Sequence, residues 1–131
     1  MAIADRRGLP VSATIASGQR NEVTLVEAAV AERFTKTKPK RLIGDRAYDS
    51  AKLEGELAAQ GIELIAPQRV NHHRRRQDGR ALRRYKRRWK VERLYAWLLR
   101  FRRLTTRYEV NPNNFQGFLH LACLVILLRH L

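Results

Sequence analysis

Two carboxylates in the sequence lie where side chains could take part in chemistry, and the first is Asp45. It ends a short apolar run at residues 41–45, which is typical of a buried strand. Side chains at strand ends project into the crevices where α/β proteins bind ligands and metals. Asp is also common in turns, so Asp45 could equally cap the turn that follows it. On position alone, turn capping is the more frequent role.

The second carboxylate, Glu92, is the only acid in a long basic segment. It could form an ordinary ion pair with Arg88, four residues earlier, worth about 0.3–0.5 kcal/mol. Alternatively, the surrounding cations could hold it near a phosphate in a metal-dependent phosphodiester reaction. Carboxylate oxygens suit hard divalent ions, and two such ions can hold the attacking and leaving oxygens in line. Such a site usually needs three or more carboxylates.

Clusters of basic residues surround Glu92, with aromatic residues between them. Their density, without compensating acids, favours phosphate neutralisation over a solvated surface, and the aromatic rings could stack on bases. We expect Trp97 instead to pack in the core. The candidate DNA-binding residues are Arg74, Arg75, Arg76, Tyr85, Arg87, Arg88, Lys90 and Arg100.

The overall charge supports a polyanionic partner. The chain has 131 residues and a formal charge of +15, of which +14 lies in residues 66–131. This balance argues against a neutral metabolic enzyme and favours DNA, RNA or an acidic membrane surface. The apolar end, residues 118–131, is shorter than the roughly 20 residues of a membrane span. We therefore expect a buried or interface helix there, with membrane-surface attachment ranked last.

The elements that must position these residues alternate between strands and helices in the first half of the chain. We expect residues 2–5 and 9–17 to form a hairpin, and we expect strands at 41–45 and 62–67. Helices are expected at 24–34 and at 50–60, the second with Ser50 as its N-cap. This order predicts an α/β fold with a mixed sheet and crossover helices.

The second half of the chain, from residue 68 onward, is predicted to form a basic loop followed by helices. Residues 68–80 are polar and basic without periodicity, which predicts a loop. A continuous helix is predicted from about 81 to 105, because apolar residues recur there at helical spacing. A last helix is expected at 115–131. The predicted organisation is therefore one partial domain, with sheet and crossover helices in 1–67, the loop in 68–80 and C-terminal helices in 81–131.

Several segments together resemble the DDE transposases of bacterial insertion sequences. GDRAYDS (44–50) resembles the motif of the second aspartate in that family, and YKRRWKVERLYAWL (85–98) resembles its glutamate motif. Tyr85, Arg88 and Glu92 match the spacing of the glutamate motif. Residues 3–22 and 101–109 resemble the flanking segments. The resemblance spans nearly the whole chain, and the combination of segments is specific.

The resemblance implies an RNase H-like fold in which three acids bind two Mg²⁺ (or Mn²⁺) ions. In the family these ions support hydrolysis at the ends of the element and strand transfer into target DNA. Asp45 and Glu92 would be the second and third acids, serving as catalytic residues and metal ligands. The implied partners are transposon-end and target DNA, further copies of the chain and, for a split gene, the product of an upstream frame. Such a protein would act in the bacterial cytoplasm, at the nucleoid.

The sequence departs from the family pattern in two places. The first catalytic Asp of the family lies on a strand upstream of the segment that matches residues 2–10, and Asp5 matches a non-catalytic turn position. We therefore expect an N-terminally truncated domain that is inactive alone. The family also has a Lys seven residues after the Glu, where this chain has Leu99, with Arg100 adjacent. The alternative function is a non-catalytic nucleic-acid-binding protein or transposition regulator, which needs the basic helix but not Asp45.

Overall fold

The computed structural model describes residues 1–68 and 79–131, and it begins with an antiparallel hairpin of β1 (Ala2–Ala4) and β2 (Pro10–Ala13). The Asp5 carboxylate closes the hairpin by accepting hydrogen bonds from the backbone N–H groups of Arg7 (2.7 Å) and Leu9 (2.9 Å). Gly8 has φ +83°, a conformation that glycine adopts without strain. The predicted hairpin and the turn role of Asp5 are both confirmed.

The middle of the chain alternates helical and strand segments, as predicted. Ser50 caps α2, since its hydroxyl accepts a hydrogen bond from the N–H of Leu53 (3.4 Å), and this prediction is confirmed. The helix predicted at 24–34 starts as a 3-10 turn and ends at Ala31, because the N–H of Phe34 bonds the carbonyl of Val11 and draws the chain onto the hairpin. The elements are η1 (Glu22–Leu25), α1 (Val26–Ala31), β3 (Arg41–Ile43), η2 (Arg46–Tyr48), α2 (Ala51–Ala59) and β4 (Glu63–Ile65).

The strands form two small sheets instead of the single mixed sheet that the sequence predicted. β1 pairs with β2, while β3 pairs in parallel with β4, so that Leu42 lies opposite Leu64. Helix α2 makes the crossover between the two parallel strands. Among the described residues, no strand pairs with the outer edge of β1 or of β3. The predicted α/β composition is correct, and the single sheet is not formed within these residues.

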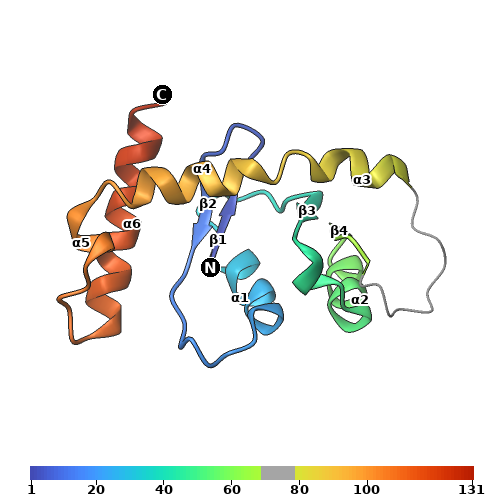
Figure 1. Cartoon of the computed structure of the whole chain (residues 1–131), viewed down its shortest axis with the longest axis horizontal. Coiled ribbons are helices and arrows are strands. Elements are labelled where there is room, and N and C mark those ends of the chain that lie inside the picture. Colours follow the sequence, from blue (N-terminus) through green and yellow to red (C-terminus); the bar gives the residue numbers. More distant parts are fainter. Residues whose placement is uncertain (69–78) are drawn as a thin grey trace.

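The helix predicted from 81 to 105 is wrong as a continuous element. It is divided into α3 (Gly79–Tyr85), α4 (Trp89–Leu98) and α5 (Arg102–Thr105), followed by α6 (Pro112–Leu128). Bonds from each N–H to the carbonyl three residues earlier form the turn between α3 and α4. This break lets α3 contact β4 while α4 contacts β1 and α6. Figure 1 shows α4 and α3 extending across the molecule above the strands, with α5 beside α6 at one end.

The core is divided between two apolar clusters. In the first, Leu94 and Leu98 of α4 pack with Cys123 of α6 and with Leu9 and Ala13 of the hairpin. Trp97 is partly buried against this cluster, which confirms its predicted packing role. The second cluster joins α1, α2 and the start of β4; its buried members are Val26, Val30, Leu53, Leu57 and Ile62. The hairpin contacts both clusters, because Ile3 of β1 packs against the second one, as do Leu42 of β3 and Leu64 of β4.

Helix α6 contributes one face to this packing. Ala122, Cys123 and Ile126 are buried, which confirms the expected buried helix, whereas Leu121 and Leu124 are exposed on its other side. Within residues 1–68 and 79–131, no helix has the length and apolar character needed to cross a membrane.

Candidate active site

The first predicted site residue, Asp45, follows β3 by two residues and is the N-cap of the short helix η2. Its carboxylate accepts a hydrogen bond from the N–H of Ala47 (2.8 Å), so it does cap the following turn. The capping bond uses Oδ1, and Oδ2 faces Arg88 at 3.9 Å. The side chain is 42% exposed, which leaves it accessible to solvent. The two roles weighed for Asp45 from the sequence are therefore compatible within one side chain.

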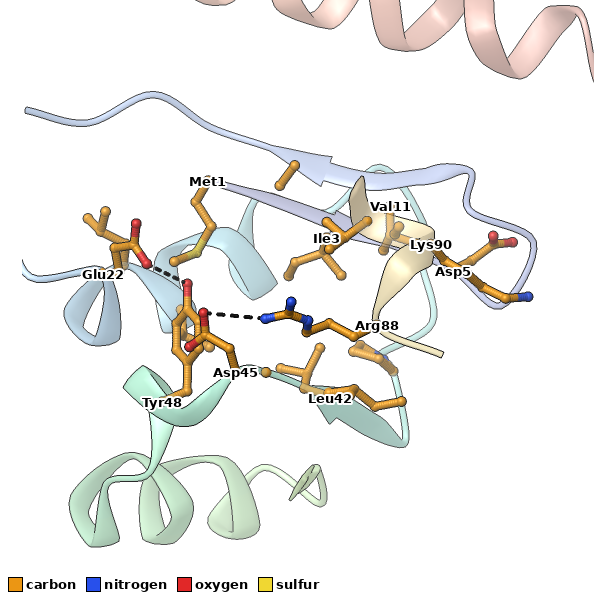
Figure 2. A pocket seen from close by; sticks show the side chains of 18 of the residues that line it. Met1, Ile3, Asp5, Val11, Glu22, Leu42, Asp45, Tyr48, Arg88 and Lys90 are labelled. Atoms are coloured by element: carbon orange, nitrogen blue, oxygen red, sulfur yellow. Dashed lines mark hydrogen bonds and ion pairs between the residues drawn. The ribbon is translucent and has the colours of Figure 1, made fainter. Parts of the chain in front are cut away.

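Arg88 lies between the two predicted acids. It is the residue before the first turn of α4, and its Nη2 is 3.0 Å from Oε1 of Glu92 one turn later. Its Nη1 faces Asp45, so one guanidinium spans two carboxylates that are 47 positions apart in the sequence. Figure 2 shows this side chain reaching from the helix side toward Asp45. The predicted ion pair with Arg88 is present, and the same contact brings Glu92 toward Asp45.

Asp45 and Glu92 also line the same pocket, which has a volume of about 900 Å³. Its walls come from β1, β3, η2 and the α3–α4 turn (Figure 2). A volume of this size lies at the upper end of the range for small-molecule sites. Eight Lys or Arg residues and four Asp or Glu residues line it, so the wall has a positive net charge. These cations are Arg6, Arg20, Lys38, Arg41, Arg84, Arg87, Arg88 and Lys90.

A hydrogen-bonded tyrosine that the sequence analysis missed lies on the same wall. The hydroxyl of Tyr48 donates a hydrogen bond to Glu22 Oε2 (3.2 Å). Burial raises the pKa of Tyr48, and the nearby carboxylates of Glu22 and Asp45 raise it further. Burial and Glu22 also raise the pKa of Tyr95, which lies on α4. Both phenols therefore stay protonated at neutral pH and can donate hydrogen bonds.

No sequence signal pointed to Glu22. It lies in η1, a separate element with no regular spacing to Asp45 or Glu92, and it enters the pocket through tertiary packing alone. Tyr48 could have been predicted as a residue of this site, because it follows Asp45 by three residues within the motif at 44–50.

Two further basic residues of α4 hold the hairpin turn. Lys90, a predicted DNA-binding residue, donates a hydrogen bond to the carbonyl of Arg6, and Arg93 donates one to the carbonyl of Arg7. The guanidinium of Arg93 also lies over the rings of Trp89 and Trp97, 4.9 Å from each centroid. This arrangement fixes the turn against the helix, so Lys90 has a structural role within the chain.

The remaining predicted DNA-binding residues are not all gathered at the pocket. Tyr85 lies under the Arg88 guanidinium at 5.7 Å, and Arg87 lines the pocket. Arg100 lines a separate concavity with Phe118. Arg100 lies beyond the end of α4 at Leu98, so helical spacing does not place it on the face of Glu92. Arg74, Arg75 and Arg76, like most of the predicted loop, lie outside the described residues.

The acids in this pocket are chemically suited to hold a divalent ion but do not complete a site. Carboxylate oxygens are the ligands that Mg²⁺ and Mn²⁺ prefer, and Arg88 already holds Asp45 and Glu92 around one positive charge. Within the part of the chain that the structure describes, no group of three or more His, Cys, Asp or Glu residues is arranged to bind a metal. The two predicted acids thus fit part of a metal site.

Comparisons with known proteins show the family of the chain. A protein described as a transposase for insertion sequence element IS402 in Burkholderia cepacia is 33% identical over 132 residues, covering 95% of this chain. This chain spans 59% of that relative. A protein described as a transposase for element IS6501 in Brucella ovis is 36% identical over 88 residues, covering 67% of each chain. No solved structure matches. The family described as the transposase DDE domain matches residues 1–128, and the chain belongs to that family.

Proposed function

We propose that residues 1–131 form the C-terminal part of an RNase H-like transposase catalytic domain that cuts and joins DNA with Mg²⁺ or Mn²⁺. The main support for this proposal is that the guanidinium of Arg88 contacts both Asp45 and Glu92, which line the same pocket. Family membership supports DNA as the substrate. Activity would require a further acid from a segment upstream of β1, so this chain alone is expected to be inactive.

In this proposal, Asp45 and Glu92 would hold the divalent ions through their carboxylates. The bound ions would supply charge stabilisation for the attacking and leaving oxygens of a phosphodiester. Oδ1 of Asp45 remains bonded to the N–H of Ala47, which fixes the orientation of the carboxylate. Arg88, which lies beside both acids, would bind a phosphate oxygen as a planar, charged donor.

The basic residues at the pocket are proposed to hold the DNA backbone. Arg84 and Arg87 line the pocket beside the two acids. Phosphate neutralisation by such residues gives affinity without sequence selection. Arg74, Arg75 and Arg76 would extend this surface, and copies of the chain or a separately encoded upstream segment would complete the active assembly at the nucleoid.

The proposal is tested by restoring an upstream segment from a homologous transposase and measuring strand cleavage of transposon-end DNA with Mg²⁺. The completed protein should cleave, and Asp45→Ala and Glu92→Ala should each abolish cleavage without loss of fold. Glu109→Ala, which removes an acid paired with Arg103 away from the pocket, is the matched control. Full activity in either site variant would overturn the assignment.

A binding measurement separates this function from a purely DNA-binding regulator. Mn²⁺ affinity of the completed protein, measured by electron paramagnetic resonance, should fall in Asp45→Ala and Glu92→Ala. A regulator would bind DNA with unchanged affinity in both variants and would show no Mn²⁺ binding that depends on these acids.

A further inference from the structure

We infer that Tyr48 and Glu22 form a positioning pair that holds the carboxylate of Asp45 at the pocket. All three residues line this pocket. The hydroxyl of Tyr48 donates a hydrogen bond of 3.2 Å to Oε2 of Glu22, which lies 26 positions earlier in the sequence. The chemical role of Asp45 rests on the proposed function, whereas the way in which its side chain is held rests on the contacts of this chain.

The turn that orients Asp45 is short. Asp45 is the N-cap of η2, a 3-10 helix of 3 residues, and the carbonyl of Asp45 accepts a hydrogen bond from the N–H of Tyr48 (3.1 Å). A single 3-10 turn has poor hydrogen-bond geometry and gains little stability of its own. The direction of the Asp45 carboxylate therefore depends on contacts that fix η2 from outside the turn.

The aromatic ring of Tyr48 provides one such contact, because it folds back against Gly44. A Cβ added to Gly44 would lie 2.9 Å from Cδ2 and 3.0 Å from Cγ of this ring, which is too close for carbon atoms. Gly44 does not have a positive φ, so the ring, and not the backbone conformation, excludes a larger residue. Gly44 precedes Asp45 and Tyr48 ends η2, so the ring spans the whole turn.

Glu22 provides the second contact and ties the ring to a separate element. It is the first residue of η1, and the side chain of Asn21 caps this element by accepting a hydrogen bond from the N–H of Val23 (3.1 Å). Val23 and Tyr48 both pack against the second core cluster. Figure 2 shows Tyr48 extending from η2 to Glu22. The hydroxyl is therefore bonded to an element that the core holds in place.

The bond to Glu22 also decides which groups contact Asp45. A phenol has one proton to donate, and the structure directs that of Tyr48 to Glu22. Oδ1 of Asp45 accepts from the N–H of Ala47 (2.8 Å), and Oδ2 faces Arg88 at 3.9 Å. Glu22 thus keeps the hydroxyl of Tyr48 from competing for Oδ2, the oxygen of Asp45 that faces a cation.

The test follows amide hydrogen exchange of the full chain by NMR, without DNA or metal. The reporter is the N–H of Ala47, which bonds Asp45, and the reference is the amide of Leu57 in α2. Tyr48→Phe removes the hydroxyl and keeps the ring, so Ala47 should exchange about fivefold faster, the change expected for the loss of one hydrogen bond, while Leu57 stays unchanged. The matched control is Tyr108→Phe, at a residue that is 69% exposed, and it should alter neither rate.

Variants of Glu22 separate its hydrogen bond from its charge. Glu22→Ala should speed the exchange of Ala47 as much as Tyr48→Phe does, and the double variant should be no faster, because both changes remove the same bond. Glu22→Gln keeps an oxygen that can accept from the hydroxyl, so it should restore the parent rate. A loss in Glu22→Gln equal to that in Glu22→Ala would reject the pair. If Tyr48→Phe does not fold, Glu22→Ala, at an exposed position, gives the same measurement.

A pair of glycine variants tests the contact of the ring. Gly44→Ala should displace the Tyr48 ring and speed the exchange of Ala47. Gly55→Ala adds the same methyl group in α2, where it meets open space, and it should leave Ala47 unchanged. Equal rates in these two variants would show that the ring does not hold the turn.

The last measurement uses the protein completed with an upstream segment, in the cleavage assay with Mg²⁺. Tyr48→Phe should lower kcat several-fold and leave KM for DNA unchanged, because Asp45 is misplaced while the basic wall is intact, and Glu22→Gln should restore most of kcat. An unchanged kcat in Tyr48→Phe, or an unchanged exchange rate of Ala47 in the chain, would overturn the positioning pair. If the completed protein does not cleave at all, the proposed function alone is rejected, because the exchange rates of the chain decide the pair without DNA or metal.

Discussion

The guanidinium of Arg88 links two acids: its Nη2 lies 3.0 Å from Oε1 of Glu92, and its Nη1 lies 3.9 Å from Oδ2 of Asp45. The pair is exposed, so its contribution to the free energy of unfolding is small, at most about 1 kcal/mol. Its importance is electrostatic, because a single cation balances two acids that would otherwise repel each other at the same pocket.

The first prediction concerns the affinity of this pocket for divalent cations. Arg88→Ala removes the intrinsic cation, so Mn²⁺ should bind the two carboxylates several-fold more tightly than in the parent chain, whereas Arg88→Lys should give an intermediate affinity. Titration calorimetry provides the measurement. Lys52→Ala, which removes an exposed cation paired with Glu56, is the control and should change nothing. Equal affinities in the parent and Arg88→Ala would contradict the idea that Arg88 competes with the metal.

The second prediction concerns DNA affinity. Arg87→Ala should weaken binding to duplex DNA uniformly across sequences and reduce the slope of log K against log salt by about one phosphate contact, or roughly 0.9. The control is Arg129→Ala at the C-terminal end of α6, which should leave the slope unchanged. Fluorescence anisotropy at several salt concentrations gives both slopes, and an unchanged slope in Arg87→Ala would remove this residue from the DNA surface.

The third prediction concerns the cap that positions α2. Ser50→Ala removes the acceptor for the N–H of Leu53 and should lower the free energy of unfolding by about 1 kcal/mol. Urea denaturation measures the loss. Ser17→Ala, at an exposed turn before η1, should cost less than about 0.5 kcal/mol. Equal losses in the two variants would show that the Ser50 cap adds no specific stability.

The fourth prediction concerns the packing of α4. Leu94 is fully buried in the first core cluster, and Leu94→Ala should cost about 2–5 kcal/mol in the free energy of unfolding. Leu99 is 59% exposed at the end of the same helix, so Leu99→Ala should lie within about 0.5 kcal/mol of the parent. Chemical denaturation of both variants tests the burial of the helix face that supports Glu92.

The fifth prediction concerns alkaline pH. Burial raises the pKa of the Cys123 thiol from 9.0 to about 11. Between these values the unfolded chain loses its thiol proton while the folded chain keeps it, so folding stability should fall as pH rises from about 9 to about 11. In Cys123→Ala, the decrease between pH 8 and pH 10.5 should be smaller than in the parent. Urea denaturation with a reductant at both pH values provides the comparison, and parallel pH profiles would contradict it.

Local sequence patterns predicted much of the fold because they depend on near neighbours. The Ser50 cap, the hairpin turn at Asp5 and the turn capped by Asp45 each follow from side chains that bond groups a few residues away. The continuous helix from 81 to 105 failed because local periodicity does not register that α3 must contact β4 while α4 contacts β1 and α6.

The sequence by itself determined the two acids, the pairing of Arg88 with Glu92 and the concentration of positive charge in residues 66–131. These features are set by residue type and by spacing along one helix, as for Arg88 and Glu92. Only the tertiary structure decided that Asp45 faces the same guanidinium, that Glu22 and Tyr48 join the pocket and that Lys90 holds a turn. Those relationships bring together elements distant in sequence, and packing of the two core clusters sets their relative positions.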